Sequence, residues 1–371
     1  MKKAGIFVLF VILFFLLRQT IYAQETTPGS DPETGYIKGE VIEVVQESVQ
    51  SASEKGMPSG TQVFKVKITT GGYKNEIITI ENVTTGNPAF DSWVTEGDKL
   101  VLAYQAVKGK LDYVDIEDYE RDKYIYRLIG LFILLLVLIG QGKGLKSVIT
   151  LTITILIVVE VMLPLLFKGY DPVIVALLAG VIITFFTLVI VGGITRKTIS
   201  AILGTSGGLL AASEIAMYFG KMAHLRGVRE EEAQILMSAQ GVNFDFQGLL
   251  FAAMIIGALG AVMDVSMSIA SSINEVSNVG RGLGMIGRIR SGMNVGRDIM
   301  GTMSNTLILA YTGSSLPLML LLMAYEPPFL KVINADYIAT ELIRSLSGSM
   351  GLILSIPITA IMAGVLMGNK N

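Results

Sequence analysis

Long apolar segments dominate the C-terminal part of the chain, and they limit its possible folds more than any other feature. A helix needs about 20 mostly apolar residues to cross the ~30 Å hydrocarbon core of a bilayer. Because that core holds no water, a crossing segment must satisfy its own backbone hydrogen bonds, as an α-helix does. About seven segments are long enough, the first being the shortest: 124–140, 146–167, 172–193, 198–220, 247–273, 299–324 and 338–366. We therefore predict a polytopic α-helical membrane protein embedded in the lipid bilayer.

The composition agrees with this class and excludes several others. The 371 residues are 51% hydrophobic, with a mean hydropathy of +0.60 and a formal net charge of −2. A near-neutral chain has no basic field that would attract nucleic acid. The chain has no cysteine and one histidine, His224, which argues against disulfides, thiol nucleophiles and a histidine-rich metal site. No phosphate-binding loop or nucleophile with a candidate base is visible, so we expect no enzyme activity, cofactor or metal.

Residues 1–23 have the three-part pattern of a secretory signal peptide. Lys2 and Lys3 precede an apolar run, and a short polar segment then ends at Ala23. Two outcomes stay open, cleavage after Ala23 or retention as an N-terminal anchor, because Ile21 is not the small residue preferred before a cleavage site. Either outcome exports the segment that follows.

Residues 24–122 are predicted to form a small exported domain rich in β-structure. Within 36–118, five short stretches carry Val, Ile, Tyr or Thr at alternate positions, which is the period of a half-buried strand. Turn sequences such as Gly71-Gly72 separate them, and five strands with such breaks suggest a small barrel of OB type. The strands carry acids as often as lysines, and an exported domain meets no nucleic acid. A structural or partner-docking role is therefore the better expectation.

The basic residues predict the orientation of the helical transmembrane domain, residues 123–371. The loops assigned to the cytoplasm hold Lys143, Lys146, Arg196, Lys197, Arg281, Arg288, Arg290, Arg297 and Lys370. Most of the acidic loop residues fall on the other side of the membrane. Because cytoplasmic loops carry an excess of Lys and Arg, we expect a multi-pass protein of the cytoplasmic membrane. Its N-terminal domain would be extracytoplasmic and its C-terminus cytoplasmic.

Two long motifs resemble a known family. GLLFAAMIIGALGAVMDVSMSIASSINEV at 248–276 and SGMNVGRDIMGTMSNTLILAYTGSSLPL at 291–318 are similar to the YibE/F family of bacterial multi-spanning membrane proteins. The segment RKTISAILGTSGGLL at 196–210 fits the same pattern. The resemblance covers about 124–367 and implies a bacterial inner-membrane protein. It offers no established activity, so no residue receives a role on this basis.

Polar side chains recur at i, i+4 and i+7 in two consecutive apolar segments, and this spacing places them on one helix face. They are Asp264, Ser268 and Ser271 in the fifth segment and Asp298, Thr302 and Asn305 in the sixth. The two segments should be antiparallel neighbours, with the polar faces at similar depth. We therefore predict that these residues line one polar cleft, open to the cytoplasm, between the fifth and sixth spans.

Three functions compete for this polar face. The first is a transporter-like permease in which the carboxylate of Asp264 binds a proton or cation, with Glu214 as a secondary intramembrane acid. In the second, Asp264 bonds across helices to Asn305 and is structural. The third is a non-transporting accessory or scaffold protein that presents its exported domain to a partner protein. The sequence identifies no substrate, and it allows either a partner protein or a homo-oligomer.

Overall fold

The computed structural model describes residues 33–51, 58–87, 91–228, 231–238, 244–279 and 284–367. The chain divides into two compact units, residues 1–135 and residues 136–371. The predicted signal peptide, residues 1–23, lies outside the described residues.

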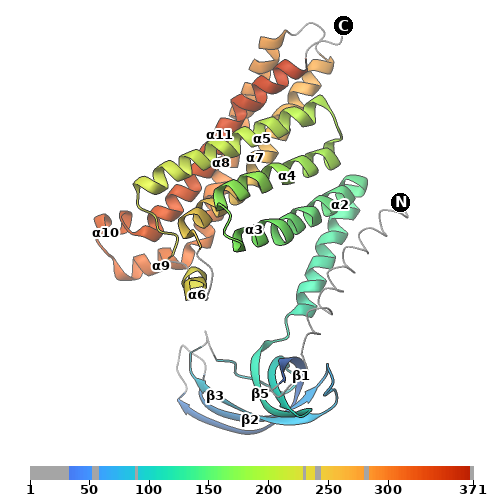
Figure 1. Cartoon of the computed structure of the whole chain (residues 1–371), viewed down its shortest axis with the longest axis vertical. Helices are drawn as coiled ribbons and strands as arrows, with labels where there is room; N and C mark the ends of the chain where they lie inside the picture. The colour runs from blue at the N-terminus through green and yellow to red at the C-terminus, as the bar shows by residue number, and fades with distance from the viewer. Residues whose placement is uncertain are drawn as a thin grey trace. The chain divides into compact units, whose positions relative to one another are not determined.

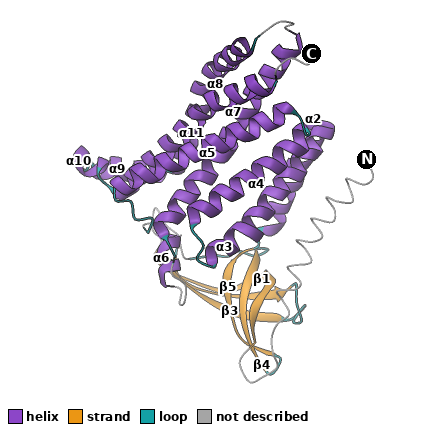
Figure 2. Cartoon of the chain, turned by 45° about the horizontal axis from the view of Figure 1, so that its top comes forward, coloured by secondary structure: helices purple, strands orange, loops and turns teal. Residues whose placement is uncertain are grey.

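The N-terminal unit contains a five-stranded antiparallel half-barrel (Figure 2). Its strands are β1 (Glu33–Ser51), β2 (Ser59–Ile68), β3 (Ile77–Thr85), β4 (Lys99–Val107) and β5 (Lys110–Tyr119). Across the sheet they lie in the order β3-β2-β1-β4-β5. The long β1 pairs with β4 through its first part and with β2 through its second part. Register shifts after Val41 and Val44 allow it to bend between the two hairpins. This is the strand order of the predicted OB-type barrel, left open between β3 and β5.

Alternation along the strands builds the core of the half-barrel. In β2, Phe64, Val66 and Ile68 are buried, while the residues between them are more exposed. One polar side chain is buried beside them: the Gln62 amide donates to the Val94 carbonyl and accepts from the Val94 N–H, both at 3.0 Å. These two bonds satisfy the buried amide and fix the segment that leads into β4.

Ion pairs join the sheet to the start of α2 (Asp122–Leu156) within the N-terminal unit. Lys38 of β1 donates to Glu120 Oε1 at 3.0 Å and also to the Asp122 carboxylate, while Lys123 donates to Glu120 Oε2 at 3.0 Å. The Glu120 side chain is only 4% exposed. Burial alone would raise the pKa of Glu120, but the hydrogen bonds and charges of Lys123 and Lys38 outweigh it and hold that pKa below its usual value. These pairs fix the end of β5 to the first turn of the helix.

Helices form the second unit (Figure 1). After α2 come η1 (Ile157–Met162, a π-helix), α3 (Leu163–Phe167), α4 (Pro172–Gly192), α5 (Arg196–Met222), α6 (Glu231–Ser238), α7 (Phe246–Val279), α8 (Met285–Ser314), α9 (Leu316–Tyr325), α10 (Phe329–Ile333) and α11 (Asp336–Leu366). In the part of the chain that the structure describes, five helical runs are long and apolar enough to cross a membrane. The number rises to six if α8 and α9, which meet at a 62° bend, form one span.

The prediction of about seven spans differs from this count because the run Asp122–Phe167 is counted once. Gln141, inside that run, has non-helical angles of φ 47° and ψ −126°. A Cβ atom on Gly144 would lie 1.9 Å from the Leu136 carbonyl oxygen, which is possible only if the chain folds back here. The break predicted between 124–140 and 146–167 is therefore present.

Small residues let α5 and α11 pack closely. A Cβ atom on Gly204 would lie 1.8 Å from Thr359 Oγ1, and one on Gly351 would lie 2.4 Å from Ala212 Cβ. Glycine at these positions allows the backbones to approach, as in the small-xxx-small contacts of membrane helices. Both helices contribute buried residues to the core of the helical unit.

We expect Gly351→Ala to lower the thermal unfolding midpoint of the purified protein by several degrees. The added methyl group would meet Ala212 Cβ at 2.4 Å and the Gly208 carbonyl oxygen at 2.8 Å, so the two backbones must separate. Gly260→Ala is the matched control, because a Cβ atom there meets nothing within 4 Å and alanine favours a helix over glycine by ~1 kcal/mol. Equal unfolding midpoints for the two variants would contradict the α5–α11 contact.

The Glu120 ion pairs predict an acid-sensitive N-terminal unit. A carboxyl group with a lowered folded-state pKa stabilises the fold above its unfolded pKa, here about 4.5, and this stabilisation is lost as the pH falls through the folded value. We expect the free energy of unfolding to fall between pH 7 and pH 3, and to fall less in Lys38→Met. The probe is the fluorescence of Trp93, the single tryptophan, whose carbonyl accepts the Tyr119 hydroxyl at 2.7 Å.

Lys65→Met is the control for that experiment. It removes an ion pair with Glu43 whose side chains are 42% and 53% exposed, and such pairs contribute little to stability. The free energy of unfolding of this variant should depend on pH as that of the wild type does. The same pH dependence in Lys38→Met and Lys65→Met would show that the Glu120 pairs do not stabilise the unit.

Candidate functional site

Asp264 and Ser268 are exposed on α7, and Ser271 on the same face is half-buried. The opposite face of α7 is packed into the helical unit, with Val262 and Ile269 fully buried. The predicted polar face of the fifth segment is therefore turned outward from the helices that surround α7.

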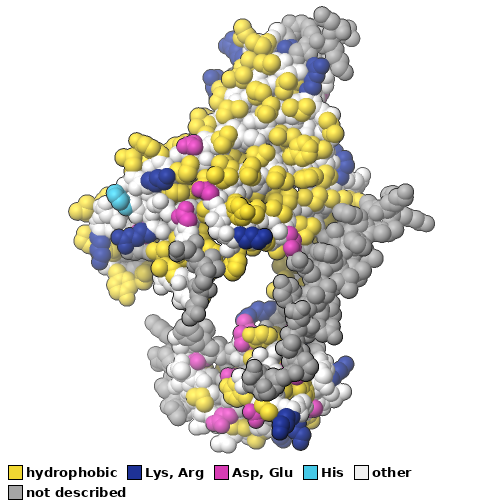
Figure 3. All heavy atoms as spheres, in the orientation of Figure 1, with side chains coloured by type: hydrophobic (Ala, Val, Ile, Leu, Met, Phe, Trp, Pro, Cys, Tyr) yellow, Lys and Arg dark blue, Asp and Glu magenta, His cyan; other side chains and the backbone are white. Residues whose placement is uncertain are grey.

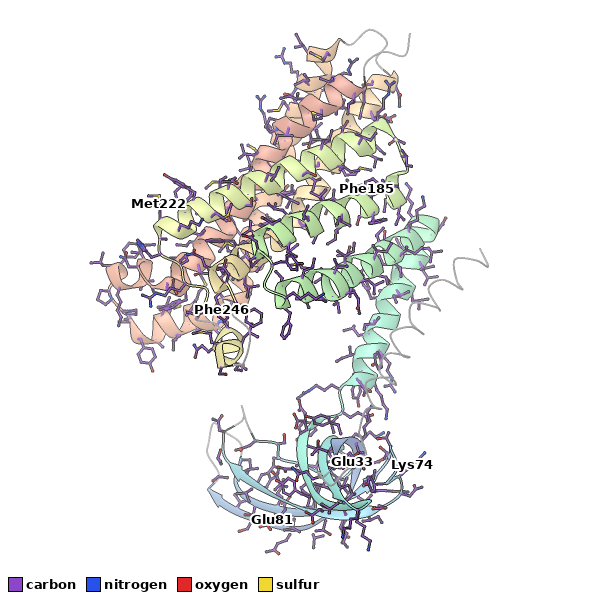
Figure 4. The ribbon with its side chains drawn as sticks, in the orientation of Figure 1. Glu33, Lys74, Glu81, Phe185, Met222 and Phe246 are labelled. Carbon is purple, nitrogen blue, oxygen red and sulfur yellow. The ribbon has the colours of Figure 1, made fainter. Side chains whose placement is uncertain are left out.

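The exposed stripe of α7 contains only small and polar side chains over most of its length. Between positions 246 and 275 the exposed residues are Ala253, Gly257, Gly260, Asp264, Ser268 and Glu275, a set we call the α7 stripe. The exposed large apolar residue of α7 is Val279, at its last position. By contrast, α4 exposes Leu178, Ile182 and Phe185, and Phe185 is labelled in Figure 4. Hydrophobic side chains also cover much of the visible face of the helical unit (Figure 3).

The predicted polar residues of the sixth segment are exposed too. Asp298, Thr302 and Asn305 lie on α8, and Thr306 beside them is also exposed. The hydroxyl groups of both threonines donate to backbone carbonyls of their own helix, at 2.9 Å each. The exposed side of α8 is thus mainly polar through the middle of the helix, although Met300 is exposed there too.

The packing of α8 explains why these residues face outward. A Cβ atom on Gly292 would lie 2.4 Å from Ile273 Cδ1, and one on Gly296 would lie 2.1 Å from Ile356 Cγ2, so both glycines face α7 and α11. Helical spacing puts Asp298 on the opposite side of α8 from Gly296. The structure makes α7 and α8 antiparallel neighbours, with both polar sets on the surface of the helical unit. That the two sets line one cleft stays a prediction.

Asp264 has no hydrogen bond or ion pair within the described residues. It lies near the middle of α7, where a charged side chain facing hydrocarbon would cost about 2.5–3.5 kcal/mol on insertion scales. Acids inside membranes normally face a bundle interior or a water-filled cavity. An unpaired acid on the α7 stripe therefore requires water or another polar surface beside it.

Glu214, the predicted secondary acid, is exposed on α5. Glycine positions on α5 contact Val262 and Phe251 of α7, through Gly208 and Gly220 respectively. These two contacts place Glu214 level with a point on α7 that lies about seven residues before Asp264. At 1.5 Å per residue, the two acids are roughly 11 Å apart along the helix axis. The structure does not bring the two acids together.

A charged pair that was not predicted from the sequence lies inside the last span. In α11, Arg344 Nη1 lies 3.0 Å from Glu341 Oε1, with side chains 18% and 25% exposed. Their charges act on Tyr311 of α8, whose buried hydroxyl has no partner among the described residues. A Cβ atom on Gly257 would lie 2.6 Å from that hydroxyl, so glycine leaves room for the tyrosine. Opposite charges at i and i+3 in an apolar segment were the available signal.

Apolar helices of spanning length and a separate half-barrel define a multi-spanning membrane protein with a small β-domain. The family described as YibE/F-like protein matches residues 128–369, and the YibE/F family N-terminal domain matches residues 36–119. The chain belongs to the YibE/F family, which confirms the resemblance of its two long motifs. Comparisons with curated proteins and with solved structures found no match.

Cysteine labelling can test whether water reaches the α7 stripe, because the chain has no cysteine of its own. In membranes, we expect Ser268→Cys to react with a water-soluble maleimide on the order of tenfold faster than Leu178→Cys, since the reactive thiolate forms in water. Leu178 is the matched control because it is 59% exposed on the apolar surface of α4. Equal rates at the two positions would show that the stripe faces lipid.

Proposed function

We propose that this protein is a transporter-like permease in which Asp264 binds a proton or a cation. The proposal rests on one acid near the middle of a membrane helix that has no partner among the residues described by the structure. Over most of its length, the stripe around this acid exposes no large apolar side chain. If the stripe faced lipid, this acid would lie in hydrocarbon at a cost of about 2.5–3.5 kcal/mol. The α7 stripe is instead suited to contact with water or with a hydrated ion.

The neighbouring polar groups supply the rest of the proposed path. Ser268 and Ser271 follow Asp264 along α7, and Asp298 and Thr302 lie on the exposed side of α8. Hydroxyl and carboxylate oxygens are suitable partners for a hydrated proton or a hard cation. The sequence contains no phosphate-binding loop, so we propose that an ion gradient, and no enzymatic step, drives transport.

The half-barrel favours a second candidate function, that of a non-transporting accessory protein. Tyr36, Ile77 and Val83 are 69%, 58% and 68% exposed, which is unusual for large apolar side chains on a small sheet. The sheet also ends at β3 and β5, and an open edge can accept a strand from another protein. In this role the half-barrel would dock a partner protein and the helical unit would anchor it.

Flux measurements separate the two candidates. Protein reconstituted into liposomes with an internal pH-sensitive dye should carry protons or a test cation when a gradient is imposed. We expect Asp264→Asn to reduce the flux to the level of protein-free liposomes, because the amide cannot ionise. Asp112→Asn, in the half-barrel, should keep the wild-type flux.

Two results would count against the permease. A flux unchanged in Asp264→Asn would exclude a role of that carboxylate. A wild-type flux equal to that of protein-free liposomes, for protons, sodium and potassium alike, would favour the accessory function.

A further inference from the structure

A large cavity lies where α5 ends and α11 begins, and it shares no lining residue with the α7 stripe. Its volume is about 960 Å³, at the upper end of the range for ligand sites. It is lined by residues 223, 224 and 226 after α5, by the end of α9, and by the segment from 326 to 339. Met222, the last residue of α5, is labelled in Figure 4. A second cavity of about 210 Å³ shares Asp336 and Tyr337 with the first.

Charged side chains of both signs line this cavity. The basic ones are His224, Arg226 and Lys331, and the acidic ones are Glu326 and Asp336. Arg226, Lys331 and Glu326 form no ion pair with any residue that the structure describes. Several basic side chains gather around the single histidine in Figure 3. Charges of both signs that are not paired with each other fit a ligand that itself carries both charges.

Helix ends add to the same pattern. The residue that caps the C-terminus of α5, Ala223, and the one that caps α9, Glu326, both line the cavity. Helix C-termini carry partial negative charge and favour a cation. Ala335, at the N-terminus of α11, also lines the cavity, and a helix N-terminus favours an anion.

An apolar surface adjoins this charged cavity. No residue of α9 is buried, and Leu321 and Tyr325, which line the cavity, are 52% and 78% exposed. Phe329, the first residue of α10, is 77% exposed. The cavity lies at the ends of spanning helices, the level at which lipid headgroups meet water. A ligand with a charged head and apolar tails would contact both surfaces at once.

We propose that this cavity binds the headgroup of an amine-containing zwitterionic phospholipid, phosphatidylethanolamine. Arg226 and Lys331 contact the phosphate, Glu326 accepts hydrogen bonds from the ammonium group, and the acyl chains lie along α9. A choline headgroup lacks the N–H donors for Glu326, and a glycerol headgroup lacks the positive charge. The site therefore distinguishes among phospholipids by the amine.

The test uses the full-length protein in detergent, with phosphatidylethanolamine, phosphatidylcholine or phosphatidylglycerol of matched acyl chains added back. Native mass spectrometry counts the retained lipids, and thermal unfolding reports the stabilisation. We expect phosphatidylethanolamine to be retained most and to raise the unfolding midpoint most. Equal retention of the three lipids by the wild type would overturn the proposal.

Two variants assign the contacts separately. Arg226→Gln should weaken the retention of all three lipids, because each has a phosphate. Glu326→Gln should remove only the preference for the amine headgroup and leave phosphatidylglycerol retained. Lys221→Gln is the control, because Lys221 is a basic residue at the end of α5 that does not line the cavity. An unchanged preference in Glu326→Gln would overturn the assignment.

Soluble phosphoethanolamine distinguishes a lipid from a free ligand with the same headgroup. We expect phosphoethanolamine to stabilise the protein far less than the lipid does, because the contacts of the acyl chains with α9 are missing. Equal stabilisation by the two would overturn the lipid assignment and identify a soluble phosphoamine as the ligand. None of these outcomes depends on whether Asp264 supports transport.

Discussion

The hydrocarbon core of a bilayer offers no hydrogen-bond partners, and the polar groups of the helical unit are arranged around this constraint. Its buried hydroxyl groups bond mainly to their own helix: Thr184 donates to the Gly180 carbonyl, Ser355 to the Leu352 carbonyl and Thr359 to the Ser355 carbonyl, each at 2.7 Å. These bonds free the helices to pack through small side chains, as α5 and α11 do. A carboxylate costs more to place in hydrocarbon than a hydroxyl group does. Asp264, which has no hydrogen bond or ion pair within the described residues, therefore stands out against this background.

The sequence was sufficient to predict what depends on local pattern. Alternation gave the five strands, and apolar length gave the spanning helices and the break near Gln141. Helical spacing also identified residues that share a face, such as Asp264 and Ser268. It could not tell which neighbour a face meets, because that depends on packing partners elsewhere in the chain. On α8 the decisive residues are Gly292 and Gly296, whose close contacts turn Asp298 outward.

The pair Glu341–Arg344 was missed for a related reason. A hydropathy window long enough to detect a membrane span averages over both charged residues, so its mean stays apolar and the pair is not noticed. In the structure the two side chains form an ion pair at 3.0 Å. Small residues carry a similar ambiguity. Gly257 on the α7 stripe leaves room for the Tyr311 hydroxyl, whereas Gly260, three residues on, has nothing within 4 Å of its Cβ position. The two glycines therefore differ in packing: only Gly257 is needed to make room for a neighbouring side chain.

The two proposed sites differ in the chemistry that they require. Asp264 is a single acid on a narrow stripe of small side chains, so it can interact with an ion. No basic side chain in the described part of the chain pairs with it, so nothing there would hold a phosphate. The cavity at the start of α11 has basic and acidic groups together, and an apolar helix at its edge. A lipid headgroup matches the cavity and would not match the stripe. Because α11 runs from this cavity to the contact of Gly351 with α5, a lipid bound there would stabilise the packing on which the helical unit depends.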